Sequence, residues 1–131
     1  LLKQYLQDYE EVYDYRNIEV TIDEQDIFNV TMNESLAVAL LTNLLKNAFV
    51  HNIDGGHIRI TVTKNSITFR NSGVENPLDK EHIFERFYQG TKKEGSTGLG
   101  LAIADSICRL QHLSIRYYFE QKEHCFEISR Q

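Results

Sequence analysis

Apolar residues recur along this chain at two spacings, one typical of amphipathic helices and one typical of strands. Helical spacing predicts a short helix over residues 2–15, a long one from residue 31 to about residue 51, and another over residues 98–112. At the start of the long helix, Thr31 and Glu34 fit a capping box, in which both side chains satisfy free backbone amides. The side chains expected to face the core are Leu36, Leu40, Leu44 and Ala48, with Leu41, Leu45 and Phe49 beside them, and Leu99, Ile103, Ile107 and Leu110 in the last helix.

The segments between these helices alternate apolar and polar residues, which predicts strands. Residues 72–97 show little periodicity, and only a short helical turn around residues 82–88 is expected there. Strands interleaved with two long helices favour an α+β fold, a two-layer α/β sandwich with helices on one face of a mixed sheet of about five strands. The expected strands are residues 17–22, 26–30, 57–63, 67–71, 113–119 and 125–129.

Composition narrows the class of protein without naming a function. A chain of 131 residues with 41% apolar residues predicts one globular domain, and its net charge of −5 gives no electrostatic reason to bind nucleic acid or an anionic membrane. The longest apolar run, residues 36–41, is far too short to span a bilayer. The two cysteines, Cys108 and Cys125, have no metal-ligand spacing. Buried thiols are expected, and one disulfide between them is the alternative that the sequence leaves undecided. No signal peptide is visible and the first residue is Leu1, so we expect a piece of a longer cytoplasmic protein.

The stretch from Gly95 to Ala104 is rich in glycine and runs directly into the last predicted helix. The N-terminus of a helix presents unpaired N–H groups and the positive end of a dipole, so it attracts phosphate. Glycine at positions 95, 98 and 100 would let a ligand approach the backbone closely. Glycines before a helix are more often a cap or a tight connection, so this stretch alone indicates phosphate binding only weakly.

Three other groups of residues could carry chemistry. Asn43 and Asn47 lie four residues apart on the long helix and therefore project on the same side. Their amides either bond to backbone and water at the edge of the helix, or one amide oxygen completes the ligand shell of Mg²⁺. Asn71, before Ser72 and Gly73 at the end of a strand, is either a turn former or an acceptor for an exocyclic amine. The aromatic cluster at residues 83–88 favours local packing when it is considered alone.

In this order, the groups resemble the ATP-binding catalytic domain of sensor histidine kinases, in the superfamily that includes gyrase, Hsp90 and MutL and has the Bergerat-type fold. The resemblance covers residues 17–131 and is specific because four motifs occur in sequence. Residues 1–16 would then be a linker helix from a preceding dimerisation and phosphoacceptor domain. The matching segments are residues 41–48, 71–73, 83–88 and 97–103.

The resemblance implies a role for each matching residue. Asn47 would bind the Mg²⁺ that bridges the ATP phosphates, and Asn43 would line the same site, so that these two carry the catalytic function. Asn71 stands where most members have an aspartate that pairs with the adenine amino group. Phe84 and Phe87 would anchor a mobile lid. The full set implied to bind nucleotide is Asn43, Asn47, His51, Asn71, Gly73, Phe87, Lys92, Lys93, Gly98, Leu99, Gly100 and Leu101.

The chain also departs from the family pattern. Asn71 keeps an acceptor but loses the charge of the usual aspartate, and Val74 to Pro77 follow Gly73 without the second glycine. Val50 and Gln89 stand where many members have cations that face phosphate. Lys92 and Lys93 are the cations in this chain that would substitute for them.

The function implied by the resemblance is a protein-histidine kinase that donates the γ-phosphate of ATP to a histidine on the preceding domain, with a response regulator downstream, at the cytoplasmic end of a membrane-bound sensor. None of the five histidines precedes an acidic residue in an acceptor-like helix, and His82, His112 and His124 are expected at the surface. Two alternatives stay open. One is a degenerate, non-catalytic module that acts through nucleotide or protein contacts. The other is a gyrase- or Hsp90-like ATPase, which would need a general base where this chain has Asn43.

Overall fold

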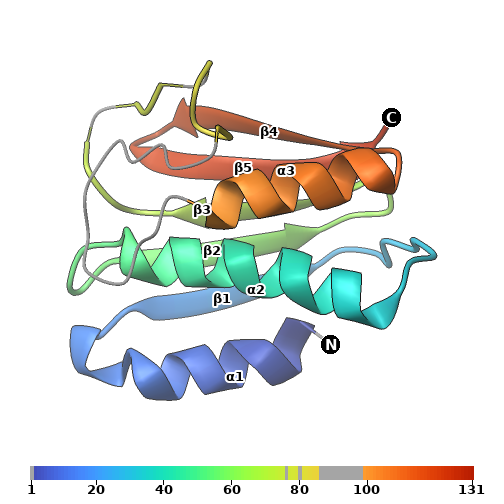
Figure 1. Ribbon diagram of the computed structural model, residues 1–131. Coiled ribbons are helices and arrows are strands. Elements are labelled where there is room, and N and C mark those ends of the chain that lie inside the picture. The colour runs from blue at the N-terminus through green and yellow to red at the C-terminus, as the bar shows by residue number, and fades with distance from the viewer. Residues whose placement is uncertain (1, 76, 80, 86–98) are drawn as a thin grey trace.

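The computed structural model describes residues 2–75, 77–79, 81–85 and 99–131, and it has two layers (Figure 1). A five-stranded sheet has the order β1-β2-β3-β5-β4, in which β1 and β2 are parallel and the other neighbours antiparallel. The helices α2 and α3 cover one face of the sheet, which confirms the predicted α+β sandwich. The bounds are α1 Leu2–Val12, a 3-10 helix Asp14–Arg16, β1 Glu19–Glu24, α2 Glu34–Val50, β2 His57–Val62, β3 Ser66–Asn71, α3 Gly100–Leu110, β4 Leu113–Glu120 and β5 Glu123–Arg130.

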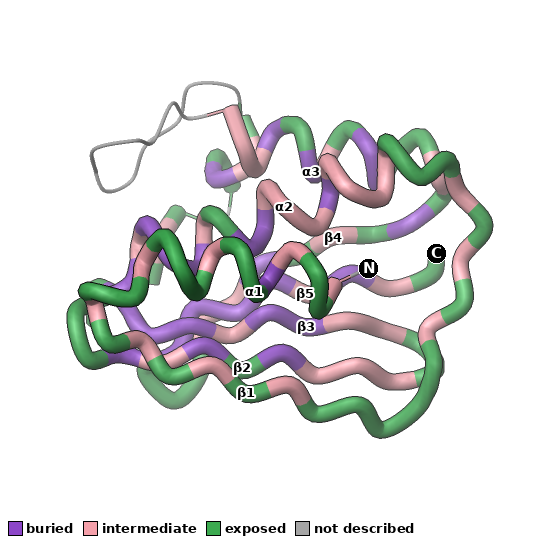
Figure 2. The backbone as a smooth tube through the Cα atoms, turned by 90° about the horizontal axis from the view of Figure 1, so that it is seen from below, coloured by how far each residue is buried: buried purple, intermediate pink, exposed green. Residues whose placement is uncertain are grey.

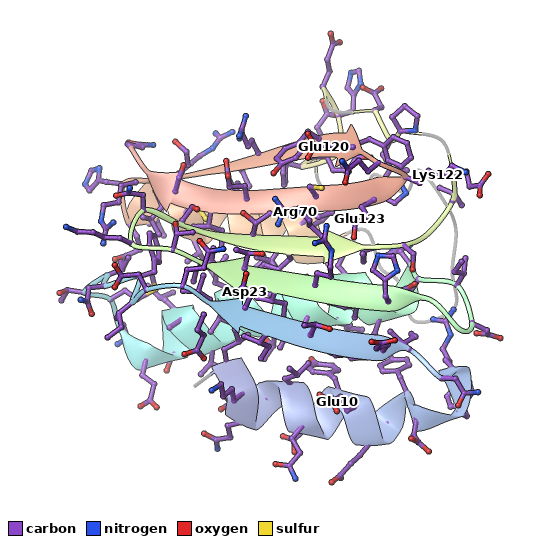
Figure 3. The ribbon with its side chains drawn as sticks, turned by 180° about the vertical axis from the view of Figure 1, so that it is seen from behind. Glu10, Asp23, Arg70, Glu120, Lys122 and Glu123 are labelled. Carbon is purple, nitrogen blue, oxygen red and sulfur yellow. The ribbon has the colours of Figure 1, made fainter. Side chains whose placement is uncertain are left out.

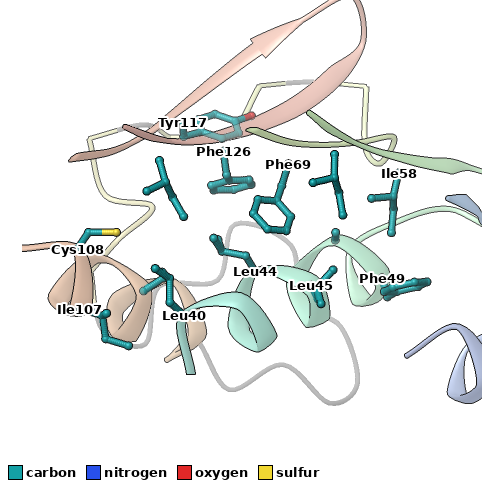
Figure 4. Close-up of a cluster of buried hydrophobic side chains, with 14 of the residues drawn as sticks. Leu40, Leu44, Leu45, Phe49, Ile58, Phe69, Ile107, Cys108, Tyr117 and Phe126 are labelled. Atoms are coloured by element: carbon teal, nitrogen blue, oxygen red, sulfur yellow. The ribbon is translucent and has the colours of Figure 1, made fainter. Parts of the chain in front are cut away.

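The core lies between α2 and the sheet, as the spacing of leucines predicts. In Figure 4 the buried side chains of α2 face Phe69 and Phe126 on the central strands. The capping prediction was wrong: Asn33 is the N-cap, and its side-chain oxygen accepts from the Ser35 amide at 2.7 Å. Thr31 lies two residues before that cap, too early to reach the amides of the first turn.

The predicted strand at residues 26–30 does not form. The amides of Gln25 and Asp26 both donate to the carbonyl of Val62, where β2 ends, so the ladder between β1 and β2 stops there. Beyond Val62 the chain turns into β3, and residues 26–30 have no strand beside them to continue the pairing. β1 also begins two residues later than predicted, because Asn17 adopts a left-handed conformation with φ of 55°.

The face that α3 turns inward differs from the prediction. Ile107 is buried as expected, but Ile103 is 42% and Leu110 67% exposed. The other buried positions of α3 carry small side chains: Ala102, Ala104 and Cys108. Figure 2 shows this alternation of buried and exposed positions along α3.

The N-terminal helix α1 packs beside α2 rather than standing apart from the domain. Leu6 is 5% exposed and belongs to the core, and the rings of Tyr9 and Tyr13 stack on Phe49 of α2. The Arg16 side chain donates to the backbone carbonyls of Phe49 and Asn52, the latter at 2.6 Å, and so caps the C-terminal end of α2. The conformation of the last turn of α2 therefore depends on the segment that precedes β1.

The other face of the sheet carries polar and charged side chains, among them Arg70 and Glu123 in Figure 3. Glu123 accepts from Arg59 through both carboxylate oxygens, at 2.6 and 3.0 Å, and lies 2.7 Å from His57. Both cysteines are buried free thiols, as expected, and burial raises the pKa of Cys108 to about 12. No helix in the described part of the chain is long and apolar enough to cross a bilayer.

Candidate nucleotide-binding site

Asn43 of α2 lies against the start of α3. The Asn43 amide nitrogen donates to the carbonyl of Ala39 at 2.6 Å, which fixes the side chain along its own helix. Its oxygen then points at Gly100, where a Cβ would come within 3.1 Å of it. Glycine therefore allows α3 to begin against Asn43, and Leu99, at the N-cap position, has no polar side chain to cap the first amides. Asn47 follows one turn later on α2 and is half-buried.

Asn71 ends β3 as a buried amide with one unsatisfied atom. It is 2% exposed, and because Phe69 faces the core, Asn71 two residues later lies on the same face of the sheet. Its nitrogen donates to the carbonyl of Ser72 at 2.8 Å, whereas its oxygen has no hydrogen-bond partner among the described residues. A buried acceptor without a donor costs free energy, so this oxygen is suited to a ligand that brings a donor.

Gly73 follows in a position that leaves no room for a side chain. A Cβ there would lie 2.8 Å from the backbone carbonyl of His51 and 3.1 Å from Cδ2 of His124. The end of α2 and strand β5 therefore enclose the backbone of Gly73 from two sides. The predicted site residues His51, Asn71 and Gly73 thus come together, although 20 residues separate His51 from Asn71.

A buried polar network that the sequence does not reveal holds these elements in place. Asn52 is 0% exposed; its nitrogen donates to the carbonyls of Ala48 and His57, and its oxygen accepts from Ile53 and from the Ser72 hydroxyl at 2.6 Å. The Ser72 hydroxyl in turn accepts from the His57 amide at 2.8 Å. The network ties the end of α2 to the residue directly after Asn71. An asparagine one residue past a helix C-cap is the only signal of it in the sequence.

The segment after Pro77 lies against the sheet through two apolar side chains. Ile83 is 2% exposed, and the ring of Phe84 meets Phe126 edge-on with centroids 6.2 Å apart. Glu81–Phe84 is a hydrogen-bonded turn, and the Glu85 amide donates to the His82 carbonyl at 2.9 Å, so the predicted short helical turn is confirmed over the described part of residues 82–88. Four predicted nucleotide ligands lie outside the described residues: Phe87, Lys92, Lys93 and Gly98.

Two predictions about charged or polar residues near the site have clear outcomes. Val50, where the family resemblance places a cation, is only 7% exposed, so a buried apolar side chain occupies that position. His124, expected at the surface, is 3% exposed, and burial lowers its pKa. It hydrogen bonds to Tyr117 and to the carbonyl of Val74, both at 2.7 Å. His124 and Tyr117 lie at inward-facing positions of the hairpin formed by β4 and β5, where alternation predicts apolar residues.

Within the part of the chain that the structure describes, side chains that suit a metal ion occur in two places. The amide oxygen of Asn47 is one, since Mg²⁺ prefers oxygen ligands and keeps several waters. The other is the surface group of Asp79, Glu81 and His82. There the hydrogen bond from His82, 2.6 Å long, lowers the pKa of Asp79, and the pair satisfies itself without an ion.

Residues 32–129 match the family described as histidine kinase-, DNA gyrase B- and HSP90-like ATPases. This chain belongs to that family. Within it, the chain is similar to sensor histidine kinase RppB of Synechocystis, at 43% identity over 57% of the chain, and to heme sensor protein HssS of Staphylococcus aureus, at 34% identity over 89%. It superimposes on the catalytic domain of histidine kinase ThkA with a TM-score of 0.83 and 25% identity, covering 97% of this chain and 87% of that one.

The chain is therefore an ATP-binding catalytic domain of the sensor-histidine-kinase type, which confirms the resemblance. It spans 18% of RppB and 26% of HssS, so those relatives contain much more than this domain. One solved structure is of ThkA in complex with the response regulator protein TrrA; the chain matches that kinase with a TM-score of 0.76 over 38% of its length. Another is the cytoplasmic segment of histidine kinase QseC, at 17% identity, which shows the fold alone.

Proposed function

We propose that this domain binds ATP together with Mg²⁺ and supplies the γ-phosphate to a histidine on another domain of the same kinase. The observation that carries the proposal is the unsatisfied oxygen of Asn71, a buried acceptor beside Gly73 at the end of β3. Membership of an ATP-binding family accounts for such an atom, because adenine has an exocyclic amine that can donate to it.

The hydrogen bond of Asn71 to Ser72 decides which atom faces the base. If the amide rotated by half a turn, its oxygen would meet the carbonyl of Ser72, and two acceptors would oppose each other at about the present 2.8 Å. The side chain is therefore held with its oxygen toward the ligand. A purine with a 6-amino group satisfies that oxygen, whereas a 6-oxo purine opposes it with a second acceptor. Asn71 thus supports adenine selectivity without the charge of the usual aspartate.

At the phosphate end, α2 supplies amide oxygens and α3 supplies backbone N–H groups. Asn47 would hold Mg²⁺ through its oxygen, and the metal, when bound, neutralises phosphate charge during transfer. Asn43 orients the start of α3, since its own oxygen lies against Gly100. The amides of Gly100 and Leu101 belong to the first turn of α3 and suit an anionic ligand. Roles for Phe87, Lys92, Lys93 and Gly98 stay predictions.

The chemistry of Asn43 argues against hydrolysis as the main activity. Its nitrogen is bonded to Ala39, and an amide does not take a proton from water at neutral pH. The buried Val50 favours the second candidate, a degenerate module, because it leaves one phosphate charge without its family cation. The kinase and the degenerate module differ in one observable, which is transfer of phosphate from ATP to a histidine.

Partners and location follow from the relatives as proposals. The acceptor histidine would lie on a domain that precedes this chain, with residues 1–16 as the linker helix and residues 17–131 as the catalytic domain. A response regulator would receive the phosphate, as the complex of ThkA with TrrA suggests. We place the domain at the cytoplasmic end of a membrane-bound sensor, without contact of its own with membrane or nucleic acid.

Calorimetric titration of the 131-residue chain with ATP tests the proposal. We expect Mg²⁺ to tighten binding by roughly tenfold or more relative to EDTA, which corresponds to at least about 1.4 kcal/mol. Asn47→Ala should abolish that gain and leave the metal-free affinity unchanged. Asn65→Ala, in the exposed turn between β2 and β3, is the matched control. Equal affinities with and without Mg²⁺, or an Asn47→Ala variant that keeps the gain, would remove Asn47 from the metal site.

A further inference from the structure

His124 on β5 and Tyr117 on β4 are two buried polar side chains outside the predicted site. Their exposed fractions are 3% and 4%. His124 is the cross-strand partner of Asn71 in the sheet. Since residues directly opposite each other in an antiparallel pair share one face, the ring of His124 lies on the same face as the Asn71 amide. The two side chains therefore border the end of β3.

The hydrogen bonds of this pair have one consistent set of directions. Nε2 of His124 lies 2.7 Å from the carbonyl of Val74, which can only accept, so Nε2 carries a proton. Burial lowers the pKa of His124, so above its ordinary value of 6.5 the ring is neutral and Nδ1 accepts. The Tyr117 hydroxyl, 2.7 Å from Nδ1, therefore donates to it and accepts from the Leu78 amide at 2.9 Å.

The pair thereby fixes the chain at two points after it leaves β3. The carbonyl of Val74 is held by His124 and the amide of Leu78 by Tyr117. Gly73, directly before Val74, lies between Cδ2 of His124 and the carbonyl of His51. The rings of Tyr117 and Phe119 flank His124, with centroids 5.9 and 4.8 Å away, and limit its movement. Release of either hydrogen bond would free the backbone that adjoins Asn71.

We propose that Tyr117 and His124 are positioning residues for the nucleotide base. They hold Gly73 and Val74 so that Asn71 and the adjoining backbone meet the base in one geometry. This inference rests on the proposed function, because it concerns the same ligand. Neither side chain is assigned to the reacting phosphate, so the pair affects recognition of the base and not the metal or the triphosphate.

Removal of one hydroxyl group tests the inference. Tyr117→Phe keeps the ring that packs on Phe126 but leaves the Leu78 amide and Nδ1 of His124 without their partner. We expect its dissociation constant for ATP to rise about tenfold, the equivalent of one hydrogen bond, while that for ITP changes by less than about twofold. The matched control is Tyr118→Phe, the next residue on β4, whose side chain points to the opposite face of the sheet.

Each outcome has a distinct meaning. Loss of ATP and ITP binding by the same factor in Tyr117→Phe would show a general structural role and overturn the inference, as would dissociation constants for both nucleotides equal to those of the wild type. If the wild-type chain bound no ATP, the proposed function itself would fail. A second measurement does not depend on a variant: nitrogen NMR of the wild-type histidines should find His124 with Nε2 protonated and Nδ1 bare, and ATP should shift both resonances. The opposite tautomer, or resonances that ATP leaves in place, would also overturn the inference.

Discussion

Replacement of Asn71 by alanine separates the stability of the domain from its affinity for nucleotide. In the free protein, the Asn71 oxygen is buried without a donor among the described residues, which costs about 1–3 kcal/mol, and its nitrogen makes one hydrogen bond, which contributes about 0.5–1.5 kcal/mol. Alanine removes both, so the two effects oppose each other. We expect the free energy of unfolding to change by less than about 1.5 kcal/mol, once a small cavity is included.

Affinity for ATP should fall much more than stability does. The variant lacks the acceptor for the 6-amino group, which corresponds to a loss of about 1–3 kcal/mol, or roughly 5-fold to 150-fold in the dissociation constant. ITP cannot use that acceptor, so its dissociation constant should stay the same or decrease. The preference of the wild-type chain for ATP over ITP should therefore disappear in Asn71→Ala.

Asn52 is the matched control, since it is also a buried asparagine but is satisfied at both ends. Asn52→Ala leaves buried groups without partners, and we expect it to lower the free energy of unfolding by about 2–4 kcal/mol. Urea denaturation and calorimetric titration of both variants measure the two effects. If Asn71→Ala lost as much stability as Asn52→Ala, or kept its preference for ATP, the reasoning about the unsatisfied oxygen would be refuted.

Three further results follow from single contacts. Gly73→Ala places a Cβ 2.8 Å from the His51 carbonyl, and the backbone must move to admit it, so the ATP affinity measured by titration should fall by about tenfold or more. An unchanged affinity would contradict the close approach. Arg16→Ala removes the charged donor from the end of α2, and urea denaturation should show a loss of about 2–3 kcal/mol; a loss under about 0.5 kcal/mol would contradict its capping role. The hydrogen bond from Arg59 lowers the pKa of Glu123 below its ordinary value of 4.5, so this carboxylate stabilises the fold above pH 4.5, and its contribution is lost as the pH falls through the folded-state pKa. Glu123→Gln should flatten that part of the curve of stability against pH, whereas parallel curves for variant and wild type would count against the assignment.

The sequence predicts the elements of this fold well where periodicity and turn chemistry agree. The stripe of leucines in α2 and the alternation in β2 and β4 recur in the structure, because one face of each of these elements is buried, whereas β3 and β5 have buried residues on both faces. The third helix departs from its prediction for a physical reason. The small side chains of Ala102, Ala104 and Cys108 are buried, whereas the larger Ile103 and Leu110 remain exposed. Size and hydrophobicity alone do not reveal which face of a helix is buried.

The residues of the candidate site also fall into two groups, those that the sequence predicts and those that it does not. Asn43, Asn71 and Gly73 could be found from the sequence, since each belongs to a motif with a fixed spacing. His124 and Tyr117 could not, because their importance arises from the pairing of β5 with β3 and from a hydrogen bond to Val74, 50 residues away. The burial of Val50 also depends on tertiary packing, so the sequence shows that this position carries no cation but does not show that its side chain is buried.

Transfer of radiolabelled γ-phosphate tests the central claim most directly. This chain, joined to the histidine-bearing domain that we propose as its acceptor, is incubated with labelled ATP and Mg²⁺. The protein is then examined for label that acid removes and alkali does not. We predict label in the wild-type protein and in Asn65→Ala, and none above background in Asn47→Ala. An unlabelled wild-type protein that nevertheless binds ATP, or an Asn47→Ala variant labelled as fast as wild type, would contradict the account.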